Sequence, residues 1–239
     1  NIEQALEQHN PCCCILDYQL PGENGLVVLK KIRSEYASDA LPVIVLTGEG
    51  DEETAVVMLQ SGAQDYLVKE DINATRLYGA IRGALQTASL QKQLTRLAHY
   101  DALTGLLNRS LLINRLGQAI HRCNRYNQKC AILHLDINKF KPMNDHYGQE
   151  YGDTILQEVA ERIRKNCRAT DSPARLGADE FAILLEQVET DTCNKIAQKL
   201  IEAIENPITI GAKNILIKVS IGISLFPDTA SSGDELLKD

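Results

Sequence analysis

The chain has 239 residues, of which 44% are hydrophobic, and this length fits one large domain or two small ones with packed cores. Its formal net charge of −7 argues against a general binder of nucleic acid or of membrane surfaces, and no apolar run approaches the length of a membrane span. The seven cysteines have no metal-type spacing and no secretory leader is visible, so we expect a cytoplasmic protein. The sequence opens on Asn1 and stops at Asp239 inside a helical pattern, which predicts a fragment cut at both ends.

The first part of the chain alternates between short apolar runs and helical spacing. Apolar runs at 12–16, 42–47 and 65–68 predict strands, and the spacing at 25–36, 53–61 and 75–85 predicts helices. The consecutive cysteines 12–14 read as small apolar residues of a buried strand. This alternation predicts a parallel sheet wrapped by helices, in which ligands bind at the carboxyl ends of the strands.

Three such strand ends carry Asp17, Thr47 and Lys69. A carboxylate can accept a phosphoryl group as an aspartyl phosphate, and a hydroxyl and an ammonium can bond its oxygens. Each residue alone is also explained as a polar residue that ends a strand. Together with the loop Pro21-Gly22 and Gly25 after Asp17, they favour a phosphoryl-transfer site.

Over residues 1–86 this pattern resembles the receiver domain of bacterial response regulators. The resemblance implies that Asp17 is the phosphoacceptor, Thr47 and Tyr66 are the switch residues, and Lys69 is the family's lysine. It also implies a sensor histidine kinase or a phosphotransfer protein as partner. Glu70 stands where the family usually has proline, and the family's first strand, with its acidic Mg²⁺-binding pair, would precede Asn1.

Residues 87–98 are expected to form a helical linker. Leu90, Leu94 and Leu97 are spaced four and three apart, while Ile81 and Leu85 lie in a different frame. Two short stripes with a change of register are weak support for a coiled coil, which needs several heptads in one frame. The linker therefore either packs on its own domain or forms a dimer.

The second half begins with a loop at 99–109, in which Thr104 or Asn108 is a candidate cap for the following helix. An apolar strand then ends on Asp136. Backbone amides in the turn after this strand, assisted by Lys141, are suited to cradle phosphates. Asn144 and Asp153 are suited to read a guanine edge, although a turn residue and a helix N-cap explain them equally well.

Two short strands, 173–176 and 181–185, flank a tight turn that carries Asp179 and Glu180. Adjacent carboxylates in a turn are unfavourable unless a cation or a charged ligand binds there. If this hairpin neighbours the strand that ends on Asp136, Asp136 and Asp179 converge. Ligands with oxygen donors alone suit Mg²⁺ better than zinc.

Taken together, these residues resemble the GGDEF family of diguanylate cyclases over residues 99–239. The match comprises the following segments: Asp101 to Arg109, Asp136 with Phe140 to Asp145, Gly148, Gly152-Asp153, Gly177 to Phe181, and Ser220 to Ser224. The fold expected for the whole chain is therefore α/β, with a truncated flavodoxin-like receiver, a helical linker, and a palm-like α/β domain of the nucleotidyl-cyclase type.

The resemblance implies conversion of two GTP into cyclic di-GMP by two domains that face each other in a homodimer, with Mg²⁺ or Mn²⁺ as cofactor. The net charge of −7 argues against nucleic acid or a membrane as a further partner. The resemblance assigns catalysis to Asp179 and Glu180, and it assigns the metal to these two residues and Asp136. It further implies GTP contacts from Phe140, Lys141, Asn144, Asp153 and Gly177, and an inhibitory cyclic di-GMP site at Arg168 and Asp171. The alternative is that Arg168 has no ligand and only places a positive charge beyond the end of a helix, where positive charge stabilises the helix.

Ala178 departs from the family, which has a second glycine in the hairpin. A methyl group is unwelcome if that position needs a positive φ or a close approach of the backbone to GTP. The alternative function is therefore a degenerate GGDEF domain that binds GTP or cyclic di-GMP and regulates a partner, such as a phosphodiesterase domain of the Glu-Ala-Leu type after Asp239.

Overall fold

The computed structural model describes residues 6, 11–48, 52–211 and 213–238, so the two chain ends noted above lie outside the described residues. The chain divides into two compact units, Asn1–Arg96 and Leu97–Asp239, called here the N-terminal and the C-terminal unit. The domain limits proposed from the sequence, 1–86 and 99–239 with a linker between them, stay predictions. Among the described residues, no helix combines the length and apolar character that a membrane crossing requires.

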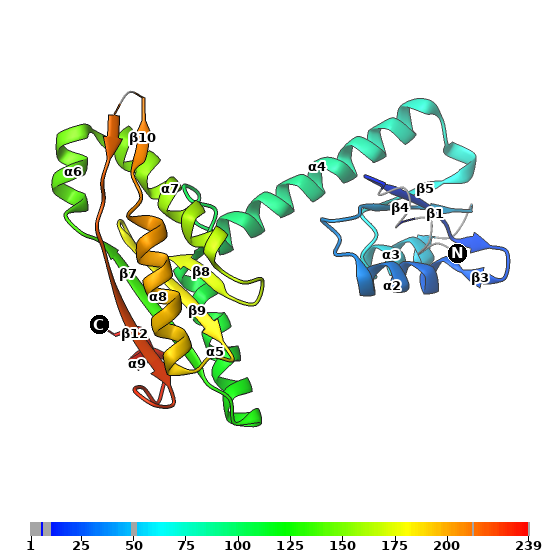
Figure 1. Cartoon of the computed structure of the whole chain (residues 1–239). Helices are drawn as coiled ribbons and strands as arrows, with labels where there is room; N and C mark the ends of the chain where they lie inside the picture. The colour runs from blue at the N-terminus through cyan, green and yellow to red at the C-terminus, as the bar shows by residue number, and fades with distance from the viewer. Residues whose placement is uncertain (1–5, 7–10, 49–51, 212, 239) are drawn as a thin grey trace. The chain divides into compact units, whose positions relative to one another are not determined.

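The N-terminal unit has a parallel sheet in the order β1-β4-β5, as the alternating pattern predicted. Its strands are β1 (Cys14–Asp17), β4 (Val43–Thr47) and β5 (Asp65–Val68), with helices α2 (Gly25–Glu35) and α3 (Glu52–Gln60) between them (Figure 1). Val43 and Val45 pack with α2 and α3 on one face, and Ile44 packs with Ala80 and Ala84 on the other. The central strand β4 is thus buried on both faces, which explains its continuous apolar run, while Ile15 of β1 is 44% exposed.

The expected strand at 12–16 was wrong at its start. Pairing with β4 begins only at Cys14, whose N–H donates to Pro42 O at 2.8 Å, and Cys12 is exposed. The apolar character of the three cysteines therefore does not reflect one buried strand. Burial does raise the pKa of the Cys13 and Cys14 thiols, so both are held in the neutral form.

The loop after Asp17 contains the short hairpin β2 (Gln19–Leu20) and β3 (Glu23–Asn24) and then turns sharply into α2. Asn24 caps this helix by accepting from Leu26 N at 2.7 Å. Gly25 is required next to it, because a Cβ there would lie 2.7 Å from both Asp17 O and Tyr18 Cα. The glycine thus holds the loop against the end of β1, where Asp17 lies.

After β5, the chain forms the 3₁₀ turn η1 (Lys69–Asp71) and then one uninterrupted helix, α4 (Ala74–His99). We expected a helix at 75–85 followed by a linker helix with a change of register, and the structure has a single helix without a break. Leu90, Leu94 and Leu97 are 52%, 67% and 68% exposed. Their role in a dimer stays a prediction.

The C-terminal unit has a five-stranded sheet in the order β12-β7-β9-β8-β6. All neighbouring pairs are antiparallel except β6 with β8. The strands are β6 (Leu107–Asn108), β7 (Cys130–Ile137), β8 (Ser172–Arg175), β9 (Glu180–Glu186) and β12 (Val219–Phe226). A separate hairpin joins β10 (Ile208–Ile210) and β11 (Lys213–Ile215).

Helices cover both faces of this sheet (Figure 1). Helices α7 (Gln149–Asn166) and α8 (Thr190–Ile204) pack on the face that carries Leu133, Leu135 and Phe181. Helix α5 (Arg109–Tyr126) packs on the opposite face against Ile132 and Leu184. The remaining helices are α6 (Phe140–Tyr147) and α9 (Gly233–Leu236).

Polar side chains complete two helix ends in this unit. Asn108 caps α5 by accepting from Leu111 N at 3.0 Å, so of the two candidate caps the structure uses Asn108. Arg162 of α7 donates to Ile204 O at 2.7 Å and to Pro207 O at 3.1 Å, where α8 has ended.

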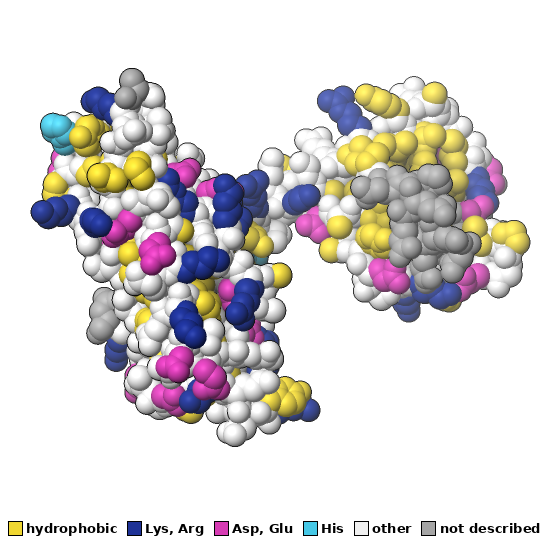
Figure 2. Space-filling view, viewed as in Figure 1, with side chains coloured by type: hydrophobic (Ala, Val, Ile, Leu, Met, Phe, Trp, Pro, Cys, Tyr) yellow, Lys and Arg dark blue, Asp and Glu magenta, His cyan; other side chains and the backbone are white. Residues whose placement is uncertain are grey.

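On the face shown in Figure 2, Lys and Arg side chains of this unit lie among Asp and Glu, with no broad field of one sign.

Candidate functional site

The centre of the candidate site is a pair of carboxylates on neighbouring strands. Asp136 on β7 stands directly opposite Glu180 on β9 in the antiparallel register. Because side chains alternate along a strand, both lie on the α5 face of the sheet, past the point where apolar packing ends. Both line a cavity of about 520 Å³.

Strand β12 leaves room for this cavity. Ser220 and Gly222 are the partners of Asp136 and His134 on β7, and Ser224 follows in the same alternation. These small residues take the place of the large side chains that fill the sheet elsewhere. Leu236 and Lys238 line the same cavity from the end of the described chain.

The hairpin turn between β8 and β9 carries the remaining acidic residue. Leu176 N donates to Glu180 O at 2.9 Å and closes the turn, and Asp179 O accepts from Ile137 N at 3.4 Å. The Glu180 carboxylate lies against the Gly177 backbone, 3.3 Å from the position of an ideal Cβ there. Asp179 is half-buried, and Gly177 and Ala178 are exposed.

Ala178 does not adopt a positive φ. The described non-glycine residues with positive φ are Asn127, Lys139 and Gln187. A methyl group was expected to be unwelcome here if the position needs a positive φ or a close approach to GTP. The first reason, backbone strain, does not arise.

The donor set fits a hard divalent cation. Asp136 and Glu180 offer carboxylate oxygens to a common cavity, and oxygen ligands are what Mg²⁺ and Mn²⁺ prefer. Among the residues that the structure describes, no group of three or more His, Cys, Asp and Glu side chains is arranged to hold a metal ion. The structure therefore brings two of the three expected ligands together, and the participation of Asp179 stays a prediction.

The candidate guanine-reading residues lie on two helices that join at one corner. Asn144 lies in the last turns of α6 and Asp153 in the second turn of α7, so neither of the ordinary roles considered from the sequence, a turn residue and an N-cap, applies. One residue, Gly148 with φ +89°, ends α6 and begins α7. The side chain of Asn144 reaches across this corner and lies against Gly152, whose ideal Cβ would be only 2.1 Å from Asn144 Oδ1.

The turn from β7 into α6 lies beside the carboxylates. Lys139 adopts φ +58° there as the residue before the helix, and Asn138 N donates to Lys218 O at 2.8 Å. Phe140 is buried and anchors the helix start, while Lys141 is exposed. The first N–H groups of α6 have no acceptors within the helix, so this end can bind an anion.

The candidate inhibitory pair forms a local turn after α7. Asp171 is 9% exposed, and its Oδ2 accepts from Arg168 N at 2.7 Å. The Arg168 side chain is exposed. The aspartate therefore shapes the turn, and the guanidinium is available at the surface.

The three strand-end residues of the N-terminal unit do converge. Lys69 Nζ lies 2.7 Å from Asp17 Oδ2, and Thr47 is buried at the end of the strand between them. The hydrogen bond from Lys69, followed by that from Gln19 N, lowers the pKa of the Asp17 carboxyl. Tyr66 on β5 is half-buried against the core. The site thus holds an ionised carboxylate beside an ammonium.

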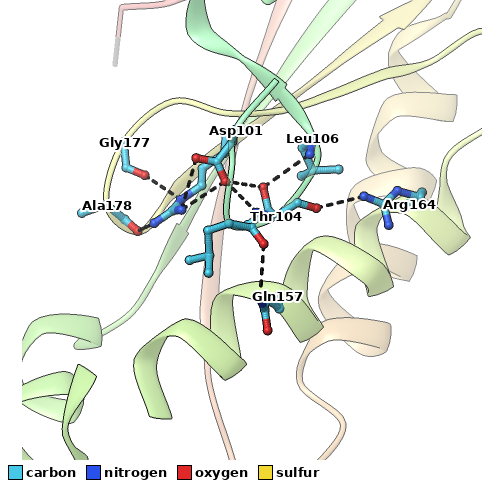
Figure 3. A network of polar contacts seen from close by, with 9 residues as sticks. Asp101, Thr104, Leu106, Gln157, Arg164, Gly177 and Ala178 are labelled. Atoms are coloured by element: carbon cyan, nitrogen blue, oxygen red, sulfur yellow. Dashed lines mark hydrogen bonds and ion pairs between the residues drawn. The ribbon is translucent and has the colours of Figure 1, made fainter. Parts of the chain in front are cut away.

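A partly buried polar network beside the hairpin was not predicted from the sequence (Figure 3). Arg175 forms an ion pair with Asp101 at 3.2 Å and also donates to the carbonyls of Gly177 and Ala178. Both charged residues belong to segments singled out above, but they are far apart in the sequence. An arginine at the end of a short strand, directly before an acidic turn, is the only local signal.

Two family descriptions match the chain. Residues 98–239 match "Diguanylate cyclase, GGDEF domain", and residues 1–82 match "Response regulator receiver domain". Both resemblances noted in the sequence are therefore confirmed.

Three similar proteins illustrate the range of relatives. The chain is 44% identical over 154 residues to the bifunctional diguanylate cyclase/cyclic di-GMP phosphodiesterase MucR of Pseudomonas aeruginosa, covering 64% of this chain and 22% of MucR. It is 29% identical over 225 residues to the response regulator PleD of Caulobacter vibrioides, covering 90% of this chain and 49% of PleD. A solved GGDEF domain of TpbB from Pseudomonas aeruginosa aligns with a TM-score of 0.56 and 37% identity, over 58% of this chain and 82% of that one. The chain thus spans from about a fifth to about half of the length of these two curated relatives.

Proposed function

The chain belongs to the GGDEF family of diguanylate cyclases and carries a response-regulator receiver domain before that domain, and we therefore propose that it is a phosphorylation-controlled diguanylate cyclase. It makes cyclic di-GMP from two molecules of GTP. The observation that carries this proposal is the pair Asp136 and Glu180, side by side at the edge of one cavity of a palm-like sheet.

Different residues of the chain bind the guanine, the phosphates and the metal ion. Asn144 and Asp153 hold the guanine, the amide by donating and the carboxylate by accepting hydrogen bonds. Lys141, Gly177 and the amides that start at Phe140 bind the phosphates. Asp136, Asp179 and Glu180 hold Mg²⁺ or Mn²⁺, which supplies charge neutralisation for the triphosphate when bound.

The reaction requires two such domains. Each holds one GTP, and a homodimer brings them face to face, so that the 3′-oxygen of one GTP bonds to the α-phosphorus of the other. The 3′-hydroxyl loses its proton and pyrophosphate leaves; the same exchange with the roles reversed closes the ring. Asp179 and Glu180 act at this reacting centre.

The N-terminal unit supplies control. Asp17 accepts a phosphoryl group from a sensor histidine kinase or a phosphotransfer protein, and Lys69 and Thr47 bond its oxygens. When Thr47 moves to bond the phosphoryl group, the Tyr66 side chain changes its orientation. The exposed leucines of α4 meet a second copy in the active dimer.

Product feedback is expected at Arg168. The Arg168→Ala variant should lose tight binding of cyclic di-GMP while GTP binding stays nearly intact, because two charge-assisted hydrogen bonds of about 1.5–3 kcal/mol each disappear. The Asp171 turn uses only the backbone of residue 168, so the fold is retained. Calorimetric titration with cyclic di-GMP measures the effect.

Lys165→Ala is the matched control, since it also removes an exposed cation near the end of α7. Equal affinity of the native protein and Arg168→Ala for cyclic di-GMP would show that Arg168 has no role beyond favourable charge at a helix end.

A regulatory binding module is the second candidate function, and Ala178 is the observation that favours it. Its methyl group is exposed in the hairpin, where a close approach to the α-phosphate would displace the reacting atoms. A displacement of 1 Å reduces rates by about a hundredfold. The enzyme is expected to be slow but active, and Ala178→Gly should raise its rate with little change in stability.

The test is the formation of cyclic di-GMP from GTP and Mg²⁺ by the full-length protein. Product from the native protein and more from Ala178→Gly supports the cyclase. If neither protein makes product but both bind GTP or cyclic di-GMP, the regulatory module is the correct function.

A further inference from the structure

All three nitrogens of the Arg175 guanidinium are engaged near the hairpin. Nε donates to Gly177 O at 3.0 Å and Nη2 donates to Ala178 O at 2.8 Å. Nη1 faces the Asp101 carboxylate, at 3.2 Å from Oδ1 and 3.4 Å from Oδ2. The Arg175 side chain is only 13% exposed and its bonds to Asp101 are partly buried, while its two bonds to the hairpin carbonyls lie at the surface. Only a planar fork of donors can serve two carbonyls and a carboxylate together.

Asp101 is itself fixed by a tight turn. Its Oδ1 accepts from Thr104 N at 2.8 Å and from Thr104 Oγ1 at 2.6 Å, and Asp101 N donates to Leu106 O at 2.8 Å. Helix α7 holds the far side of this turn, because Arg164 donates to Thr104 O at 3.0 Å and Gln157 donates to Leu103 O at 3.3 Å (Figure 3). The turn therefore ties the hairpin to the helix that carries Asp153.

The direction of the two bonded carbonyls has a consequence for the hairpin amides. In a trans peptide the C=O and the N–H point in opposite directions. With Gly177 O and Ala178 O turned toward Arg175, the N–H groups of Ala178 and Asp179 are turned away from it. Among the residues that the structure describes, neither N–H has an acceptor. Adjacent N–H groups held in this way bind anions.

We infer that Arg175, anchored by Asp101, is a positioning residue that presents the Ala178 and Asp179 amides to a phosphate oxygen of GTP. The inference rests on the proposed function for the identity of the ligand. It adds a role for two residues outside the carboxylate and guanine contacts. It also explains why the network reaches α7: the triphosphate and guanine ends of one nucleotide are held at a fixed separation.

The decisive variant is Arg175→Lys, which retains the positive charge beside Asp101 but cannot bond both carbonyls. The matched control is Arg122→Lys, because Arg122 also makes a two-pronged ion pair, with Glu186 at the other end of β9. We expect Arg175→Lys to lower the NMR order parameters of the Ala178 and Asp179 amides, because the hairpin backbone loses the donors that fix its two carbonyls. Its kcat/KM and its affinity for Mg²⁺·GTP should each fall at least about tenfold, and Arg122→Lys should stay within about twofold of the native protein.

A second variant tests whether the pair acts as one unit. Asp101→Asn keeps an acceptor for Thr104 but removes the charge that anchors Arg175. Combined with Arg175→Lys, it should add little to the effect of Arg175→Lys alone, since residues in one network are not additive. Full additivity of the two effects would overturn the pairing.

The readouts separate this inference from the proposed function. Unchanged order parameters of the two amides in Arg175→Lys overturn the inference, as do lower order parameters with native affinity for GTP. A native protein that binds Mg²⁺·GTP but forms no cyclic di-GMP overturns the cyclase function. In that case the ratio of the GTP affinities of the variant and the native protein, together with the order parameters, still decides the role of Arg175.

Discussion

Replacing Asp136 with asparagine is expected to abolish the Mg²⁺ dependence of GTP binding and to reduce cyclic di-GMP formation by about a hundredfold to a thousandfold. Asparagine has nearly the same shape as aspartate but carries no charge, so it is a much poorer ligand for a hard cation. Calorimetric titration of GTP with and without Mg²⁺ and a product assay measure the two effects. Asp179→Asn tests the third expected ligand in the same way.

The same variant should retain the fold, because asparagine has nearly the same shape as aspartate and the apolar core is unchanged. A cooperative melting transition is therefore expected for Asp136→Asn in the absence of Mg²⁺. This outcome would exclude misfolding as the reason for lost activity.

Asp191→Asn serves as the control, because it removes an exposed carboxylate from the first turn of α8, outside the cavity. Native activity is expected there. GTP binding by Asp136→Asn that stays strong and dependent on Mg²⁺ would contradict the metal assignment.

Gly152→Ala is expected to weaken GTP binding by roughly tenfold to a hundredfold, although it adds only a methyl group to a helix. The new Cβ would lie 2.1 Å from Asn144 Oδ1 and 3.3 Å from Phe140 Cζ. The flexible amide end of Asn144 must move, and a hydrogen bond to the guanine is lost at a free-energy cost of about 1.5–3 kcal/mol. The fold should survive, because alanine is the better helix former by roughly 0.5–1 kcal/mol.

The control for this prediction is Gly117→Ala in the middle of α5, where an added Cβ meets nothing within 4 Å. That variant should bind GTP normally. Equal GTP affinity for Gly152→Ala and the native protein would mean that the Asn144 side chain does not contact the nucleotide from this position.

Local patterns predicted the sheet of the N-terminal unit because its strands are short apolar runs, and the central strand β4 is buried on both faces. The end of each strand could be read from a polar residue, and Asp17 and Lys69 do meet. The start of β1 could not be read in this way, since Cys12 and Cys14 have the same side chain and only pairing with β4 distinguishes them. The helix expected at 75–85 and the linker helix after it form one helix, α4, because a change of apolar frame does not interrupt backbone hydrogen bonds.

The candidate site was predictable where family motifs are contiguous and unpredictable where contacts join distant segments. Asp136 and Glu180 were both named from the sequence, but their pairing depends on the register of β7 with β9. The helical setting of Asp153 was missed because Gly148 starts α7 earlier than an Asp cap would. The bond between Asp101 and Arg175 joins the entry turn to β8, and no local pattern relates those residues.

The single-residue joint at Gly148 limits how this domain can vary in length. Since one glycine ends α6 and begins α7, an inserted or deleted residue there would rotate one helix against the other and separate Asn144 from Gly152. Length differences among homologues, and inserted tags or reporter domains, are therefore not to be expected at the corner between α6 and α7.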